Sequence, residues 1–125
     1  MDRNKEKFKK DFKARIYLFI LRLLKFIDTL PKESVCRIIG DQLIRSGTSI
    51  GANYVEAQAS SSKKDFTNFL HYSLKSCNES KFWLALLRDL RKGDLKEITC
   101  LLQELNEIAN IFGSSLLTLK GKKKF

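Results

Sequence analysis

The strongest constraint on the fold is a row of apolar residues that recurs at steps of three or four in the first part of the chain. This row consists of Phe8, Phe12, Ile16, Phe19, Leu23, Phe26 and Leu30. A repeat of about 3.5 residues places every member on one side of an α-helix and keeps that side against a partner helix at a shallow angle. The row therefore predicts a long helix that starts near Phe8 and packs lengthwise in a bundle.

A second helix is predicted from about Lys32 to Ala59, with large apolar residues such as Leu43 and Ile50 on one face. Pro31 separates it from the first helix. Proline cannot continue a helix interior, and it biases the residue before it away from helical angles. We therefore expect the first helix to end near Thr29, followed by a short turn.

Capping residues mark the remaining boundaries. Ser62, with Asp65 three positions later, has the form of a capping box that opens a third helix. Gly93 suits the left-handed position that commonly follows a helix C-terminus. Asp94 with Glu97 then repeats the capping pattern at the start of a fourth helix. The chain thus divides into four helical segments joined by short turns.

The composition agrees with an all-α fold. Among 125 residues there are one proline and six glycines, few enough for long helices and too few for an architecture with many turns. Four long helices joined by short turns form an antiparallel up-down-up-down four-helix bundle. We expect residues 1–125 to form one such domain, with residues 1–7 as a mobile basic arm and residues 120–125 as a basic tail.

The positive charge is concentrated at the two ends of the chain. The formal net charge is +10, and residues 1–25 contribute nine Lys or Arg against three acids. The segment 120–125 adds four lysines, whereas residues 26–119 carry eleven bases and eleven acids. Polycationic ends favour an anionic partner, nucleic acid first and an acidic protein or lipid surface next. Solubility alone is the alternative explanation.

The bundle topology predicts that these charges meet. An even number of antiparallel helices returns the chain to the end where it began, so both basic segments would share one pole. There the predicted nucleic-acid-binding residues are Lys5, Lys7, Lys9, Lys10, Lys13, Lys120, Lys122, Lys123 and Lys124. Lysines in such a cluster contact phosphates and release their counterions without reading sequence.

Five residues are predicted to have structural or interface roles. Gly47 and Gly51 lie one turn apart in the second helix, where each glycine costs about 1 kcal/mol relative to alanine, and this indicates that another backbone packs close by. Asn53 and Glu56 are either a satisfied core amide and a solvated charge, or a buried polar pair that fixes register between helices or subunits. Trp83 is interpreted as a core or interface residue, with base stacking as the alternative.

No pattern of catalytic, cofactor-binding or metal-ligating residues emerges. His71 is the single histidine and has no cysteine or acid at metal-ligand spacing. Cys36, Cys77 and Cys100 are far apart and are interpreted as buried thiols of a reducing cytoplasm. No glycine-rich phosphate loop or paired nucleophile and base is present. The sequence therefore predicts a protein that is not an enzyme and has no cofactor or metal.

The first helix does not resemble a secretion signal or a membrane span. Arg22 and Lys25 interrupt its apolar part, and the longest uncharged apolar run, Ile16–Leu21, is far shorter than the roughly 20 residues that cross a bilayer. We expect a cytoplasmic protein that does not bind a membrane.

The run Gln42–Ala57, QLIRSGTSIGANYVEA, resembles the signature of the 23S rRNA-intervening-sequence proteins, a family of small four-helix bundles. Lys63–Phe66 and Glu79–Leu84 are also similar to that family. The resemblance implies a homo-oligomeric ring, expected to be a pentamer, with no known catalytic residues. A relative is the accessory variability protein of diversity-generating retroelements, a basic pentamer that works with a reverse transcriptase and nucleic acid.

Together these features predict a non-enzymatic oligomer that binds RNA or DNA through basic surfaces with little sequence specificity. The alternative is a protein-interaction scaffold or accessory subunit, for example to a reverse transcriptase, whose basic ends serve solubility or steering.

Overall fold

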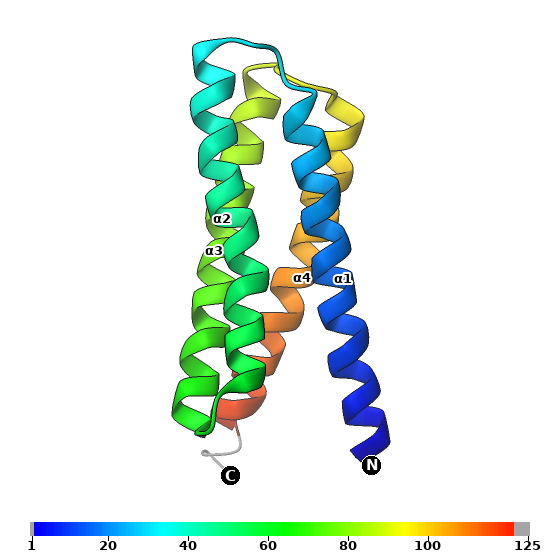
Figure 1. Ribbon diagram of the computed structural model, residues 1–125, viewed down its shortest axis with the longest axis vertical. Helices are drawn as coiled ribbons and strands as arrows, with labels where there is room; N and C mark the ends of the chain where they lie inside the picture. Colours follow the sequence, from blue (N-terminus) through cyan, green and yellow to red (C-terminus); the bar gives the residue numbers. More distant parts are fainter. Residues whose placement is uncertain (1, 122–125) are drawn as a thin grey trace.

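The computed structural model describes residues 2–121, which form four helices and no strand. They are α1 (Asp2–Asp28), α2 (Ser34–Ala59), α3 (Lys63–Asp89) and α4 (Leu95–Gly121). Consecutive helices run antiparallel, and the two ends of the chain lie at the same end of the molecule (Figure 1). The predicted all-α, up-down-up-down bundle is confirmed.

The apolar row of α1 is the contribution of that helix to the core. Every member from Phe12 to Leu30 is buried, whereas Phe8 is 53% exposed. The other helices supply matching buried residues, among them Leu43, Leu84 and Leu105, each with no exposed surface. The spacing therefore identified the core side of α1 correctly, except at the first predicted position.

Helix α1 begins six residues earlier than predicted. Residues 2–7, which were expected to form an arm, are part of the helix. None of these residues is a glycine or proline, and Glu6 precedes Lys10 by four positions, a spacing that supports an exposed helix. The ring of Phe8 also stacks on that of Phe12, with centroids 5.9 Å apart. These local interactions extend the helix beyond the core that Phe12 begins.

The predicted N-terminal caps take the expected positions, whereas the left-handed cap of α3 is Arg91 and not Gly93. Ser62 Oγ accepts a hydrogen bond from the backbone N–H of Asp65 at 3.1 Å. Arg91 follows the C-cap of α3 with a φ of 57°, and the N–H of Lys92 donates to the carbonyl oxygen of Leu87, so Gly93, with a φ of +88°, lies beyond the cap in the turn. Asp94 Oδ1 accepts from the backbone N–H of Lys96 at 3.2 Å. These contacts satisfy backbone groups that the helix ends would otherwise leave unpaired.

Helices α2 and α3 are the most closely packed pair, and serines lie along their contact. The hydroxyls of Ser46 and Ser80 are hydrogen-bonded at 2.8 Å, and both side chains are fully buried. Ser73 Oγ donates to the carbonyl oxygen of Ile50 at 3.0 Å. Small side chains allow the two backbones to approach, and their hydroxyls stay satisfied within the contact.

Gly47 and Gly51 face α1 rather than α3. A Cβ at Gly47 would collide with Leu23 Cδ2, and one at Gly51 would lie 2.8 Å from Ile20 Cδ1. The sequence predicted close packing at both glycines. The close partner is the set of large side chains on α1, not a second backbone.

Replacing Gly47 by alanine should destabilise the fold, although alanine is the better helix former. Overpacking costs about 1 to 3 kcal/mol, and fully buried Leu23 has little room to move. Gly113 is the matched control, because a Cβ there meets nothing within 4 Å. Gly113→Ala should raise the free energy of unfolding by about 1 kcal/mol. Urea denaturation of both variants measures the difference. An equal increase in the free energy of unfolding from both substitutions would contradict this packing.

Candidate nucleic-acid interface

The predicted lysines of the N-terminal segment lie together on one end of the bundle. Lys5, Lys7, Lys9, Lys10 and Lys13 occupy the first half of α1 and are all exposed. Lys120, in the last turn of α4, is also exposed and lies at the same end, as the positions of the chain ends show (Figure 1). Lys122, Lys123 and Lys124 lie outside the described residues.

Two further lysines belong to this end and were missed from the sequence. Lys63 and Lys64 open α3 next to the turn from α2, and both are exposed. The predicted up-down topology was sufficient to identify them, because it places the α2–α3 turn at the end of the bundle where the chain starts and finishes. We call the described set the basic pole. It comprises Lys5, Lys7, Lys9, Lys10, Lys13, Lys63, Lys64 and Lys120.

Ion pairs among the described residues lie away from the basic pole. Arg15 on α1 donates from Nε to Glu104 Oε2 on α4 at 2.7 Å, and Arg22 donates from Nε to Glu97 Oε2 at 2.6 Å. The second bond lowers the pKa of Glu97. The other pairs involve Arg45, Arg88 and Lys92, together with a second bond of Arg15. No lysine of the basic pole appears among these pairs, so no described carboxylate neutralises it by direct contact.

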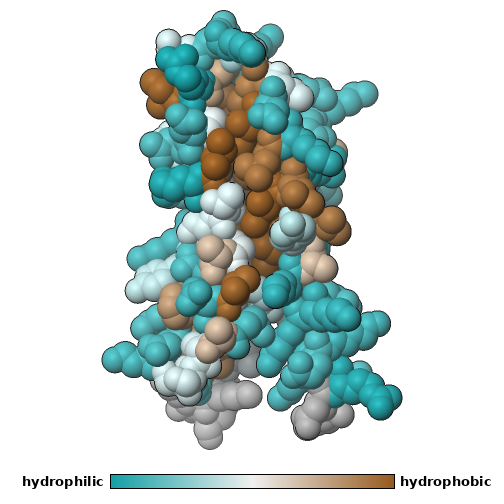
Figure 2. Space-filling view, in the orientation of Figure 1, coloured by the Kyte–Doolittle hydropathy of each residue, from teal (hydrophilic) through white to brown (hydrophobic). Residues whose placement is uncertain are grey.

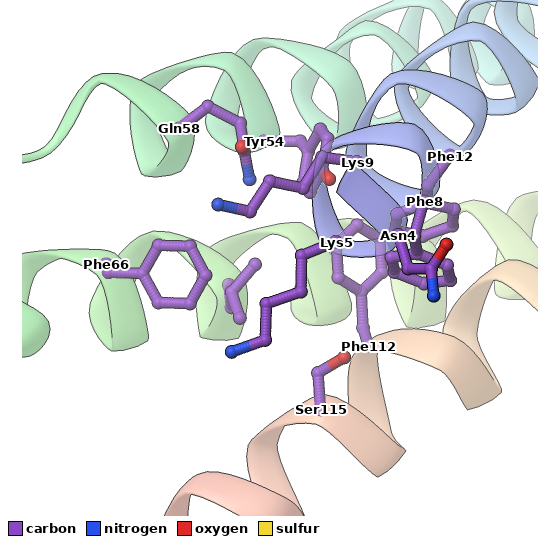
Figure 3. A pocket seen from close by; sticks show the side chains of 11 residues that line it. Asn4, Lys5, Phe8, Lys9, Phe12, Tyr54, Gln58, Phe66, Phe112 and Ser115 are labelled. Carbon is purple, nitrogen blue, oxygen red and sulfur yellow. The ribbon is translucent and has the colours of Figure 1, made fainter. Parts of the chain in front are cut away.

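A cavity of about 310 Å³ opens beside the basic pole (Figure 3). Its apolar lining consists of Phe8, Phe12, Tyr54, Phe66, Leu70 and Phe112, and its polar lining of Asn4, Lys5, Lys9, Gln58 and Ser115. Helices α1 and α4 are the least closely packed neighbours and diverge toward the chain ends (Figure 1). That divergence leaves Phe8 and Phe66 partly exposed beside the buried rings of Phe12, Tyr54 and Phe112.

Trp83 is half-buried and lies near the end of α3 that is remote from the basic pole. Its indole Nε1 donates to Glu79 Oε2 at 2.9 Å, and Arg45 on α2 pairs with the same carboxylate. These bonds lower the pKa of Glu79, the indole contributing most. The indole therefore joins a polar network between α2 and α3, and its position keeps it out of any site built on the basic pole.

Asn53 and Glu56 are not bonded to each other within the chain. Asn53 Nδ2 donates to the carbonyl oxygen and to the hydroxyl of Ser49, both at 2.9 Å, whereas Glu56 is exposed. A short polar side chain can bond to the backbone of the preceding turn, and this local option satisfies the half-buried amide. Within a single chain the two residues are therefore a satisfied amide and a solvated charge, and their role in a contact between subunits stays a prediction.

The cysteines divide into two buried thiols and one exposed thiol. Burial raises the pKa of Cys77 to about 12, and it also raises that of Cys36. Cys100 was expected to be buried and is exposed, because Ile98 and Leu101 take the core side of α4 and leave Cys100 on the other face. Among residues 2–121 there is no cluster of three or more His, Cys, Asp or Glu side chains able to hold a metal ion. No helix in this part of the chain is long and apolar enough to cross a membrane.

Fold and surface together define a small four-helix bundle with one strongly basic end. The family model of the 23S rRNA-intervening sequence proteins matches residues 10–114, and the chain belongs to that family. A similar solved structure is that of a protein of unknown function from the S23 ribosomal protein family of Bacteroides thetaiotaomicron VPI-5482. The two sequences are 32% identical, the match covers 84% of this chain and 97% of that chain, and the TM-score is 0.76. No curated protein is significantly similar. The family resemblance seen in the sequence is confirmed.

The emission of Trp83, the single tryptophan, should report the titration of Glu79. Because the folded pKa lies below the ordinary value of 4.5, the ionised carboxylate stabilises the fold. This stabilisation is present above pH 4.5 and is lost as the pH falls through the lower, folded value. We expect an emission change with a midpoint below pH 4.5 that is absent from Glu79→Gln. A midpoint at or above 4.5 would contradict the hydrogen bond.

Proposed function

We propose that the protein is a cytoplasmic, non-enzymatic homo-oligomer that binds RNA or DNA through the basic pole with little sequence specificity. The observation that carries the proposal is the gathering of eight exposed lysines, from α1, α3 and α4, at one end of the bundle with no ion-pair partner among the described residues. The reference to 23S rRNA in the family name agrees with an RNA partner.

The chemistry of the basic pole suits phosphates better than bases. A lysine ammonium is a flexible point charge that attracts any phosphate, whereas arginine, asparagine and glutamine present planar forks that match the edges of particular bases. Binding by lysines alone gains its free energy from counterion release and falls steeply as salt rises. We therefore expect tolerance of sequence and strong dependence on ionic strength.

The apolar face formed by α1 and α2 supports the homo-oligomer. Figure 2 shows apolar side chains gathered in a band along the middle and upper part of this view, where α1 and α2 face the reader. The exposed apolar residues of the two helices include Tyr17, Leu21, Ile44 and Val55. Each lies within one helical turn of Ile20, Gly47 or Gly51, which form the contact between α1 and α2. Soluble monomers rarely expose a continuous apolar band of this kind, and a second copy of the chain would cover it.

The same apolar face favours one alternative function, that of a scaffold or accessory subunit for a partner protein such as a reverse transcriptase. In that case the basic pole would only steer a charged complex toward its target. Binding of nucleic acid by the isolated protein separates the two functions, because a scaffold does not require it.

The salt dependence of binding should decrease when lysines of the basic pole are removed. We expect Lys7→Gln, Lys10→Gln and Lys64→Gln together to reduce the slope of log K against log salt on duplex DNA by about 0.9 for each lysine that contacts a phosphate. Fluorescence anisotropy between 50 and about 200 mM salt covers the range in which such contacts change affinity strongly.

The control for this experiment removes three cations from the opposite end. Lys25, Lys32 and Arg37 are exposed, belong to no ion pair of the described residues, and lie near the α1–α2 turn. Their replacement by glutamine lowers the net charge by the same amount and should change the slope much less. Equal losses in the two variants would show that total charge, and not the basic pole, governs binding.

The oligomer should dissociate when the apolar face receives a charge. Tyr17 is 63% exposed in the single chain, so Tyr17→Glu leaves the fold intact while placing a carboxylate in the proposed contact. Leu117 on α4, which is 70% exposed, provides the matched Leu117→Glu control. Light scattering should give a multiple of 14.5 kDa for the parent and the control and a smaller mass for Tyr17→Glu. A monomeric parent would contradict the assembly.

A further inference from the structure

The aromatic floor of the cavity beside the basic pole is built from three rings on three helices. Phe12, Tyr54 and Phe112 make edge-to-face contacts, with centroids 5.2 Å apart for Phe12–Tyr54 and Phe12–Phe112 and 6.0 Å for Tyr54–Phe112. All three side chains are at least 95% buried, so the floor is fixed. Tyr54, like any tyrosine, is uncharged at neutral pH, and burial raises its pKa further, to about 12.

The walls of the cavity are apolar and partly exposed. Phe8 stacks on Phe12 with an interplanar angle of 19° and remains 53% exposed, so the Phe8 ring is available to a ligand. Phe66, at the start of α3, is half-buried on the other side (Figure 3). Aromatic rings prefer to stack on other flat π systems, and such contacts add free energy beyond the area they bury.

Charged and polar groups lie at the rim. The side chains of Lys5 and Lys9 extend over the cavity toward Phe66 and Gln58 (Figure 3). Asn4, Gln58 and Ser115 add donors and acceptors around an otherwise apolar lining. A fitting ligand therefore has a flat, weakly polar ring that enters the cavity and an anionic group beside it that meets the lysines.

We propose that this cavity takes an unpaired base of single-stranded nucleic acid, while Lys5 and Lys9 contact the adjoining phosphates. The inference rests on the proposed function and specifies its substrate class. At about 310 Å³ the cavity is at the small end of ligand sites, a size suited to one base rather than to a folded peptide. Bases in a duplex are paired and stacked internally, whereas a single strand offers its bases to aromatic side chains.

Binding to three probes tests this inference on the full-length protein. The probes are an oligothymidylate of about 20 nucleotides, longer than the roughly 4 to 16 nucleotides of typical single-strand sites, the same strand with abasic sites throughout, and a duplex of the same length. Loss of the bases should weaken single-strand binding by about 5-fold or more, the effect of one base–aromatic stack. Equal affinity for the intact and abasic strands would overturn the inference.

A pair of phenylalanine variants locates the contact. Phe8→Ala should weaken binding of the intact strand by about 5-fold or more, leave duplex binding within about 2-fold, and leave the salt slope unchanged, because the change removes a stack and no charge. Phe82→Ala is the matched control, since Phe82 is 56% exposed on α3 far from the cavity. Circular dichroism and thermal unfolding verify the folding of both variants.

The outcomes separate the two proposals. Equal loss from Phe8→Ala and Phe82→Ala, or no loss from Phe8→Ala, would overturn the cavity as the site of stacking while leaving binding by the basic pole intact. Absence of binding to all three probes at low salt would overturn the proposed function and this inference together.

Discussion

The structure depends on the close contact between α2 and α3. Hydroxyls of Ser46 and Ser80, bonded at 2.8 Å, and of Ser73 stay satisfied inside that contact, so small polar side chains bring the two backbones together without leaving a buried group unpaired. The glycines of α2 then admit Leu23 and Ile20 from α1 on the neighbouring face. Helix α1 is thereby held to the α2–α3 pair along its middle, and its N-terminal half diverges from α4 (Figure 1).

This divergence relates the packing to the proposed function. Ion pairs of Arg15 and Arg22 join α1 to α4 in the middle of the bundle and toward the α1–α2 turn. Beyond Arg15, toward the chain ends, the described residues of α1 and α4 form no such pair, and the exposed aromatic cavity opens there. Weak packing, an apolar cavity and lysines with no ion-pair partner among the described residues thus occur at one end, where a polyanion with free bases would find both charge and stacking surface.

Periodicity and capping residues were sufficient to predict the fold, because each helix has a regular apolar side and each turn has a strong local signal. Helix α2, for example, was predicted from 32 to 59 and runs from Ser34 to Ala59. The start of α1 was predicted too late, because the prediction followed the apolar row and gave no weight to the helix-forming residues before Phe8.

The candidate site was only partly predictable. The meeting of the two chain ends follows from topology alone. Lys63 and Lys64, however, lie in a segment with equal numbers of bases and acids, so they are recognised as part of the basic pole only when charges are grouped by their position in the fold. The cavity had no sequence signal, since Phe8 has the same spacing as the core residues. Its exposure results from the divergence of whole helices, which local patterns do not encode.

Competitive acetylation of the lysines, with and without a single-stranded polynucleotide, tests the central claim most directly. Mass spectrometry then measures the reactivity of every lysine in one experiment, and the protein needs no substitution. The account predicts protection of Lys5, Lys9 and Lys64 by the polynucleotide, while Lys32 and Lys96 at the opposite end continue to react. Equal protection at both ends, or protection confined to the opposite end, would contradict the assignment of nucleic-acid binding to the basic pole.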